Sequence, residues 1–294
     1  MPLLGAHMSI AGGLHLAFDR IREVKGESMQ IFVKNQRQWQ APSPEPQAVA
    51  LFRECWEKSG RIPVAAHNTY LINLATADPA TAEKSVHALA DEILRTEALG
   101  IPYLVMHPGA HLGQGVRTGL ENLVRNLDRA IMLSNTSHVH VLMETTAGQG
   151  AQLGSRFEEI ATILDASLYT ERLGVCFDTC HAFAAGYDIR TRAAYHETFS
   201  HFDEIIGIHR LKFFHLNDSK RELGSRVDRH EHIGKGHIGP GGFRLLLNDP
   251  RFIHHPMVLE TPKGKDLRED KENLALLHSL LRKNPVRTNL KSSI

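Results

Sequence analysis

The chain has 294 residues, of which 42% are apolar and 23% charged, a composition typical of a protein with a large buried core. Its formal net charge of +1 excludes a global basic field, so any polyanionic partner has to be held by local patches. The three cysteines are too few for a disulfide framework, and no apolar run approaches the roughly 18 residues of a membrane span. The N-terminus lacks the basic residues of a signal peptide, so a cytoplasmic protein that does not enter the membrane is expected.

Eight short apolar runs alternate with helical stretches along the chain. Their near-continuous apolar character is typical of parallel strands that are covered on both faces. Eight strand–helix alternations predict an α/β fold, a single (β/α)8 TIM barrel, although a doubly wound open sheet also fits the count. No composition break divides the chain, so residues 1–284 are expected to form one catalytic domain and residues 285–294 a loose tail. The predicted strands span residues 3–7, 29–34, 62–67, 103–107, 139–144, 173–178, 211–215 and 256–260.

Two of the intervening helices have clear sequence signals. Asp78 and Pro79 form a plausible cap and first-turn pair for the helix after the third strand. The expected apolar stripes are Val86, Leu89, Ile93 and Leu94 in this helix, and Leu274, Leu277, Leu280 and Leu281 in the last helix.

Every predicted strand ends on a polar or charged residue. In a barrel, the carboxyl ends of the strands meet at one rim, which is where active sites lie. Seven of these eight residues can bind a metal ion, so the pattern predicts a metal-dependent active site at that rim. The eight residues are His7, Lys34, His67, His107, Glu144, Asp178, His215 and Glu260.

A long segment follows the seventh predicted strand, and a loop of this length in a compact domain is usually functional. It contains Asp228 and His230, which lie on the same side of an extended segment and can therefore share a metal ion. His181 lies three residues beyond the sixth strand and can reach the same ion. Histidine is the commonest metal ligand in proteins, and this chain has 19.

The motifs at the predicted strand ends resemble the endonuclease IV family of apurinic/apyrimidinic endonucleases. The resemblance runs from Gly5 to Glu260 in the order of the family. The motifs are His-Pro-Gly at 107–109, Glu-Thr-Thr-Ala-Gly-Gln-Gly at 144–150, Asp-Thr-Cys-His-Ala-Phe-Ala-Ala-Gly-Tyr-Asp at 178–188, His-Leu-Asn-Asp-Ser at 215–219 and Gly-Ser-Arg-Val-Asp-Arg-His at 224–230, with Lys-Asn-Gln-Arg-Gln-Trp at 34–39 and Tyr-Leu-Ile-Asn-Leu at 70–74.

The resemblance implies a barrel that holds three Zn²⁺ ions, with Mn²⁺ or Fe²⁺ as further options at some sites. Glu144 would bridge the first and second ions. The implied ligand sets are His67, His107 and Glu144; Glu144, Asp178, His215 and Glu260; and His181, Asp228 and His230.

The implied activity is DNA repair: hydrolysis of the phosphodiester 5′ to an abasic site in double-stranded DNA, leaving a 3′-hydroxyl and a 5′-deoxyribose phosphate. Removal of blocking groups from 3′ ends is a further expected activity, and the enzyme is expected to act as a monomer. Glu144 and Glu260 are the expected catalytic residues, with Glu260 placed to orient the attacking hydroxide. By the resemblance, Arg37, Tyr70 and Leu71 enter the DNA at the lesion, where flipping an abasic nucleotide needs no base to be unstacked.

Basic residues of two loops are expected to hold the DNA backbone. The loop after the second strand offers Lys34 beside Arg37. The segment after the seventh strand offers Lys220, Arg221, Arg226 and Arg229.

Four further residues lie in or near these motifs. The family usually has Asn after the bridging glutamate, where this chain has Thr145, which puts the support of Glu144 in question. Cys176 is expected in the core and Cys180 beside the site, because oxygen and nitrogen ligands suffice without sulfur. His7 is expected to form supporting hydrogen bonds.

Two other classes of protein share part of this pattern. A metal-dependent TIM-barrel sugar isomerase would use Glu144, Asp178, His215 and Glu260 alone, and would need neither the other ligands nor the basic loops. A non-catalytic, metal-dependent DNA-binding protein would not need the open coordination positions that the ligand sets leave.

Overall fold

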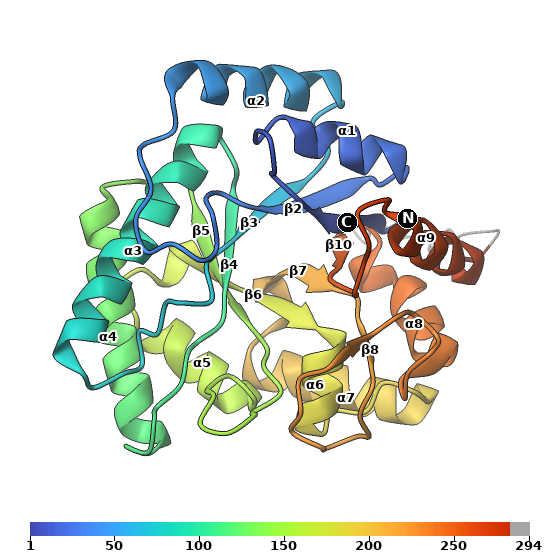
Figure 1. The fold of residues 1–294 in the computed structure, drawn as a ribbon. Helices are drawn as coiled ribbons and strands as arrows, with labels where there is room; N and C mark the ends of the chain where they lie inside the picture. The colour runs from blue at the N-terminus through green and yellow to red at the C-terminus, as the bar shows by residue number, and fades with distance from the viewer. Residues whose placement is uncertain (283–294) are drawn as a thin grey trace, which may run out of the picture.

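The computed structural model describes residues 1–282, and eight strands of this part of the chain close into a parallel barrel (Figure 1). Around the barrel, the strands follow one another in the order β1, β10, β7, β6, β5, β4, β3, β2. The closed order confirms the predicted (β/α)8 barrel and excludes the open sheet. The barrel strands are β1 (Leu3–Met8), β2 (Ser28–Phe32), β3 (Val64–His67), β4 (Tyr103–Met106), β5 (His140–Glu144), β6 (Leu173–Asp178), β7 (Leu211–His215) and β10 (Pro256–Leu259).

Helices connect successive barrel strands and cover the outside of the barrel (Figure 1). They are α1 (Leu16–Glu23), α2 (Pro46–Lys58), α3 (Pro79–Leu99), α4 (Val116–Ser134), α5 (Phe157–Ala166), α6 (Thr179–Ala185), α7 (Arg192–Ile205), α8 (Gly239–Leu247) and α9 (Arg268–Leu280), with 3₁₀ turns at Thr170–Arg172, Ile208–Arg210 and Pro250–Phe252. Two short antiparallel strands, β8 (Asp218–Ser219) and β9 (His230–Glu231), lie in the long segment between β7 and α8.

The barrel is a packed core and not a channel. Its interior contains a layer of fully buried apolar side chains from six neighbouring strands, each two residues before the polar residue at the carboxyl-end rim. The opposite faces of the strands pack under the helices in a second, larger apolar cluster. The interior layer consists of Ala65, Val105, Leu142, Cys176, Phe213 and Val258.

Six of the eight barrel strands differ from the prediction by one or two residues at an end, among them β2, β3 and β10. β3 begins at Val64 and not at Ile62, because Pro63 has no N–H to give to the ladder. β2 ends at Phe32, which pairs with the last residue of β3, so Lys34 lies beyond the ladder. The eighth barrel strand ends at Leu259, so Glu260 is the first residue after it.

The helix signals are confirmed with two exceptions. The side chain of Asp78 accepts a hydrogen bond from Thr81 N at 2.8 Å, and Pro79 occupies the first turn of α3. Leu94 is 52% exposed, because it lies about 100° around the helix from the buried Ile93. Leu281 lies just beyond the last turn of α9. The predicted tail, residues 285–294, lies outside the described residues, so the division of the chain at residue 284 stays a prediction.

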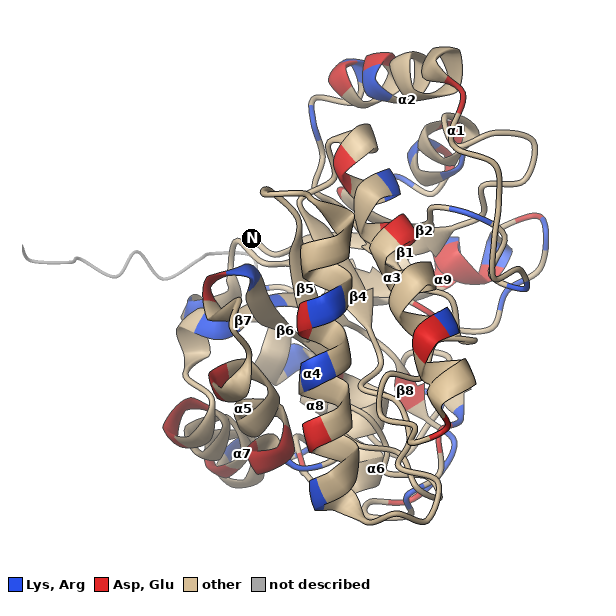
Figure 2. Cartoon of the chain, turned by 90° about the vertical axis from the view of Figure 1, so that its left-hand side faces the viewer, with Lys and Arg blue, Asp and Glu red and all other residues tan. Residues whose placement is uncertain are grey.

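The outer surface has no dominant sign of charge along α4, where Arg residues alternate with Asp and Glu (Figure 2). Within residues 1–282, no helix has the length and apolarity needed to cross a membrane.

Replacing Phe213 by Ala is expected to lower the free energy of unfolding by about 3–5 kcal/mol, because the barrel interior cannot collapse around the lost ring. Urea denaturation followed by circular dichroism measures the loss. The control is Met132→Ala on the outside of α4, where the side chain is 65% exposed and the loss should stay within about 0.5 kcal/mol. Equal losses in the two variants would contradict a tightly packed interior.

Candidate metal centre

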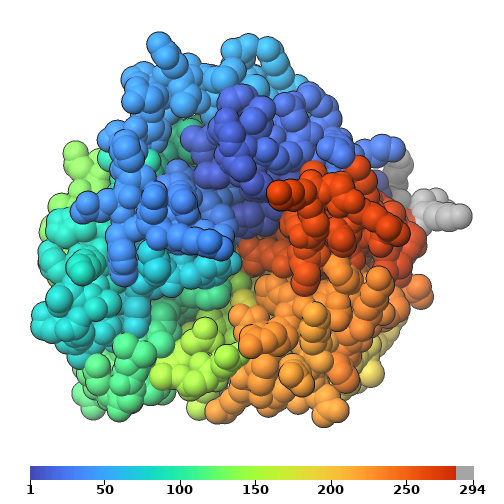
Figure 3. All heavy atoms as spheres, in the orientation of Figure 1, coloured from blue at the N-terminus to red at the C-terminus, as the bar shows by residue number. Residues whose placement is uncertain are grey.

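The nine residues predicted as ligands converge at the carboxyl-end rim of the barrel. Six of them end or directly follow barrel strands, one lies on α6, and two lie in the long segment between β7 and α8, where His230 begins β9. The segments after β2 and β3 and the segment after β7 lie on opposite sides of the centre of this face (Figure 3). The donor atoms of two of the predicted sets lie within 4.8 Å of one another: His67, His107 and Glu144; and Glu144, Asp178, His215 and Glu260.

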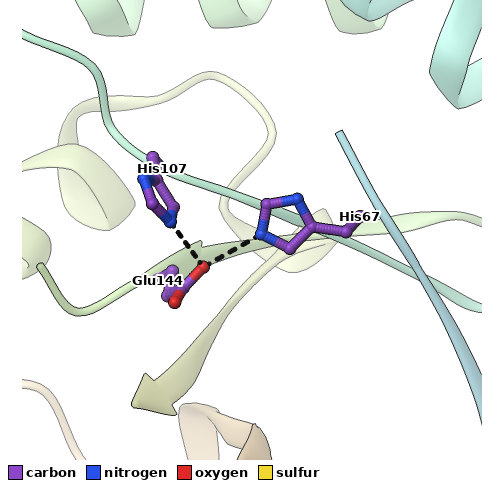
Figure 4. A group of neighbouring side chains, drawn as sticks. All are labelled: His67, His107 and Glu144. Atoms are coloured by element: carbon purple, nitrogen blue, oxygen red, sulfur yellow. Dashed lines mark hydrogen bonds and ion pairs between the residues drawn. The ribbon is translucent and has the colours of Figure 1, made fainter. Parts of the chain in front are cut away.

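Glu144 lies at the centre of the cluster and is completely buried. Its Oε2 atom is 3.1 Å from Nε2 of both His67 and His107 (Figure 4). Its Oε1 atom is 3.0 Å from Nδ1 of His215 and 3.1 Å from Nδ1 of His181. One carboxylate therefore presents its two oxygens to different groups of histidines, which is the arrangement that a bridging ligand requires.

The third predicted set also comes together. Nε2 of His181 is 3.2 Å from Asp228 Oδ2 and 3.3 Å from Nε2 of His230. Nε2 of His230 is 3.4 Å from Asp228 Oδ1. Asp178 joins this group at its inner side, 3.8 Å from His230, so the second and third sets adjoin one another.

Neighbouring acceptors fix the orientation of four of these imidazole rings. The Nδ1–H groups of His67, His181 and His230 are positioned to donate to the backbone carbonyls of Asn68 (2.7 Å), Thr145 (2.9 Å) and Glu260 (3.1 Å), respectively. His215 uses its other nitrogen, Nε2, to donate to the side-chain oxygen of Gln30 at 2.9 Å. In each ring, the remaining nitrogen then directs a lone pair into the cluster.

This donor set fits metal ions. With both Nδ1 atoms protonated, the Nε2 lone pairs of His181 and His230 face each other and the carboxylate of Asp228, an arrangement that a cation between them would stabilise. Imidazole nitrogen and carboxylate oxygen are also the usual ligands of catalytic zinc.

The carboxylates and histidines of the cluster stabilise one another's charged forms. Burial alone would raise the pKa of Glu144, but His107 and His215 hold it well below its usual range. Burial likewise opposes ionisation of Asp228, yet His181 and His230 lower its pKa to about 2. Burial would lower the pKa of His215, but the surrounding anionic groups, including Glu260 and Glu144, hold it well above its usual range. The cluster therefore stabilises carboxylates in their ionised form and favours positive charge beside them.

Two polar residues without a predicted role support the ligands. Gln30, fully buried in β2, donates to Glu260 Oε1 at 2.5 Å and accepts from His215. Asn217 donates to Asp178 Oδ2 at 2.6 Å, and its side-chain oxygen accepts from Glu260 N at 2.9 Å. Gln30 was detectable as a polar residue within an apolar strand, whereas nothing in the sequence separated Asn217 from its polar neighbours.

His7 occupies the position expected of a supporting residue. Its Nδ1 atom lies 3.2 Å from Glu260 Oε1 and 3.0 Å from Gln30 Nε2. Thr145, in contrast, supports Asp178 and not Glu144, because its hydroxyl accepts from Asp178 N at 2.9 Å. The Thr145 hydroxyl therefore connects the carboxyl ends of β5 and β6 at the site.

The cysteines also lie where they were expected. Cys176 belongs to the apolar layer inside the barrel. Cys180 adjoins Asp228 and His230, and its Sγ atom is positioned to donate to Arg229 O at 3.6 Å. Burial raises the pKa of the Cys180 thiol to about 12, so in this environment the sulfur is protonated at neutral pH.

A buried carboxylate holds the long segment that contains Asp228 and His230. Asp218 accepts hydrogen bonds from five backbone N–H groups, at distances of 2.8–3.2 Å. A Cβ atom on Gly236 would lie 2.5 Å from Asp218 Oδ1 and 2.4 Å from Ser219 O, so only glycine fits there. The donors to Asp218 are the N–H groups of Ser219, Gly234, Gly236, Ile238 and Gly239.

The predicted DNA-contacting residues lie around the cluster. Tyr70 is 60% exposed, and its ring centroid is 5.6 Å from that of His67 and 5.9 Å from that of His107. Leu71 beside it is half-buried, and a cavity of about 220 Å³ lies between Tyr70 and His107. The basic residues Arg37, Lys220, Arg221, Arg226 and Arg229 are exposed.

Lys34 does not lie where the prediction placed it. Its side chain is only 2% exposed, and its ammonium group is 3.1 Å from Asp91 and 3.3 Å from Glu92 of α3. Because β2 ends before Lys34, the side chain turns toward α3 and is not available to a DNA phosphate.

Comparison with known proteins gives consistent results. The family model for xylose isomerase-like TIM barrels matches residues 18–282. The chain is 52% identical over 281 residues to the probable endonuclease 4 of Chloroflexus aurantiacus, an alignment that covers 96% of this chain and 99% of that protein.

Solved structures also resemble this chain. Endonuclease IV from Thermus thermophilus superposes with a TM-score of 0.85 at 37% identity, covering 95% of this chain and 98% of that one. A D-tagatose 3-epimerase-like protein superposes with a TM-score of 0.71 at 19% identity, covering 95% and 97%. The second likeness is one of fold alone.

Replacing Cys180 by Ser is expected to leave the metal content unchanged, because the adjoining carboxylates and imidazoles suffice as ligands and the thiol is engaged by Arg229 O. Elemental analysis of protein purified without chelator measures the metal equivalents per chain. His230→Ala, made in parallel, should lose about one equivalent. Loss of an equivalent from Cys180→Ser would instead make the sulfur a ligand.

Proposed function

Because the chain belongs to the endonuclease IV family, we propose that it hydrolyses the phosphodiester 5′ to abasic sites in double-stranded DNA, leaving a 3′-hydroxyl and a 5′-deoxyribose phosphate. The same site would clear blocking groups from 3′ ends. The observation that carries this proposal is the convergence of nine imidazole and carboxylate ligands at one rim, bordered by exposed basic and aromatic residues. The three cysteines are free, as expected for an enzyme of the cytoplasm.

We propose three Zn²⁺ ions as the cofactors, with Mn²⁺ or Fe²⁺ able to replace zinc at some sites. When bound, such ions lower the pKa of water, neutralise charge on the phosphate and stabilise the leaving oxygen. Three adjoining donor sets support this number. The ligands would be His67, His107 and Glu144 for the first; Glu144, Asp178, His215 and Glu260 for the second; and His181, Asp228 and His230 for the third.

Within this scheme, the chain itself supplies orientation. Glu144 keeps both oxygens directed into the cluster, since four histidine nitrogens surround them. Glu260 is held at Oε1 by Gln30 and His7, while its Oε2 lies 3.3 Å from His215. A carboxylate fixed on one side in this way is suited to orient an attacking hydroxide with its free side.

The substrate would be held by side chains on both sides of the rim. Tyr70 stands beside His67 and His107, with Leu71 next to it in the chain, which suits insertion into the duplex next to the scissile phosphate. Arg37 on one side and Lys220, Arg226 and Arg229 on the other are free to approach the DNA backbone. The chain would act as a monomer, because one copy supplies the full ligand set.

The four-residue set Glu144, Asp178, His215 and Glu260 would also serve a sugar isomerase. An isomerase has no use for the further ligands that lie beside this set, His67 and His107 on one side and Asp228 and His230 on the other. A non-catalytic DNA-binding protein is disfavoured because it needs no oriented carboxylate such as Glu260. Incubation with a duplex containing one abasic site, followed by mapping of the cut, tests the proposal: an intact duplex would refute it.

Glu260→Gln is expected to slow the cleavage step by about 10²–10⁴-fold, because the shape of the side chain is kept while its charge is lost. This loss corresponds to a barrier higher by about 3–5 kcal/mol. Single-turnover cleavage is measured with metal content and DNA binding on the same sample. Glu171→Gln, at the opposite end of the barrel, is the control; near-wild-type cleavage by Glu260→Gln with full metal content would exclude Glu260 from the mechanism.

Arg37→Ala is expected to weaken binding to an abasic duplex by about tenfold, the loss typical of one charge-assisted contact. It should change single-turnover cleavage at saturating enzyme much less. Affinity measured against salt concentration should also show a shallower slope in the variant, because one fewer counterion is released. The control is Arg117→Ala on α4, whose side chain is 92% exposed. A thousandfold slower saturated rate in Arg37→Ala would place the residue in catalysis.

A further inference from the structure

A buried network of charged side chains joins α3 to the two loops that follow β2 and β3. Lys34, at the start of the first loop, and Glu92 of α3 have side chains that are 2% and 0% exposed, and their charged atoms lie 3.3 Å apart. The exposed arginines and lysine of the rim can contact a ligand from solvent, whereas Lys34 and Glu92 are buried and cannot. The role of this pair must therefore lie in the contacts that it makes inside the protein.

Lys34 determines the course of the first loop, residues 35–45. Its Nζ atom donates to the backbone carbonyl of Trp39 at 3.0 Å and to Asp91 at 3.1 Å. Arg95, one turn further along α3, donates to Asp91 at 2.8 Å and to the carbonyls of Ala41 and Pro42 at 2.6 and 2.8 Å. Arg37 lies between Lys34 and these anchored carbonyls along the chain.

Glu92 determines the start of the second loop. Its two carboxylate oxygens accept from the backbone N–H and the hydroxyl of Thr69, each at 3.0 Å. Thr69 is buried, and the next two residues are Tyr70 and Leu71. The same carboxylate therefore contacts both the cation that fixes the first loop and the residue that begins the second.

We propose that the Lys34–Glu92 pair is a positioning device that sets Arg37 and the Tyr70–Leu71 pair at a fixed spacing across the rim. That Arg37, Tyr70 and Leu71 bind a DNA duplex at a lesion belongs to the proposed function, and the positioning role rests on it. Two loops that enter one duplex together need a fixed separation, and loops held independently would have to be ordered on binding. Lys34, Glu92 and Arg95 are thus positioning residues, which do not touch the substrate.

The test compares Glu92→Gln with the full-length wild-type protein. In the absence of DNA, hydrogen exchange of the amides in residues 35–42 and 69–73 is expected to become about tenfold faster or more in both segments, because each loses an anchor. Binding to an abasic duplex should weaken by about tenfold or more. Single-turnover cleavage at saturating enzyme and the metal content should stay within about threefold of wild type.

The control is Glu83→Gln on the exposed side of the same helix; within residues 1–282 its ion-pair partners are Arg129 and His87, and the change should leave both segments unchanged. Removing one member of a buried ion pair strongly destabilises a protein, so Lys34→Met/Glu92→Gln, in which both charges are removed, provides a second variant in case the first does not fold. Faster exchange in one segment only, or unchanged binding, would overturn the proposal. If the wild type itself does not bind abasic DNA, the proposed function fails, while exchange in the free protein still decides whether the pair links the two loops.

Discussion

The site depends on a carboxylate that has no access to water. Glu144 ends β5, and both of its oxygens are surrounded by imidazole nitrogens at about 3 Å. An isolated buried carboxylate would be protonated or would destabilise the fold, so its ionised state depends on positive charge nearby. This requirement links the register of the barrel to its chemistry, because the histidines reach Glu144 only when β3, β4, β5 and β7 end at the same level.

Backbone carbonyls make most of the hydrogen bonds that orient the histidines of the site. The carbonyls of Asn68, Thr145 and Glu260 each fix one histidine ring, so the orientation of these ligands follows from the path of the chain and not from further side chains. Thr145 takes part twice: its carbonyl orients His181, and its hydroxyl accepts a hydrogen bond from Asp178 N. Side chains complete these hydrogen bonds where backbone is out of reach, as Gln30 does between His215 and Glu260.

The barrel and the convergence of its polar strand ends could be predicted from the sequence because both follow from local patterns, whereas the three ligand sets were implied by the family resemblance and stay a prediction. Apolar runs give parallel strands, and parallel strands in a barrel end at one rim, so the polar residue at each strand end lies near the others. Lys34 was placed wrongly by the same rule, because its partner Glu92 is distant in sequence and belongs to a helix. Asp218 was missed because its role depends on N–H groups of residues 219–239, whose path no periodicity reveals. The sequence thus did not reveal those contacts between distant segments that follow from no strand or helix pattern.

The segment between β7 and α8 is anchored by its own first residues. Asp218 accepts hydrogen bonds from N–H groups of residues 234–239, where the segment comes back to the barrel. Ser219 O also accepts from His237 N at 2.8 Å, so the two ends of the loop are bonded to each other. The strands alone supply Glu144, Asp178, His215 and Glu260, whereas Asp228 and His230 come with this closed loop. The loop is therefore a self-closed module: it brings two candidate ligands to the rim while its own strands stay outside the hydrogen-bonded register of the barrel.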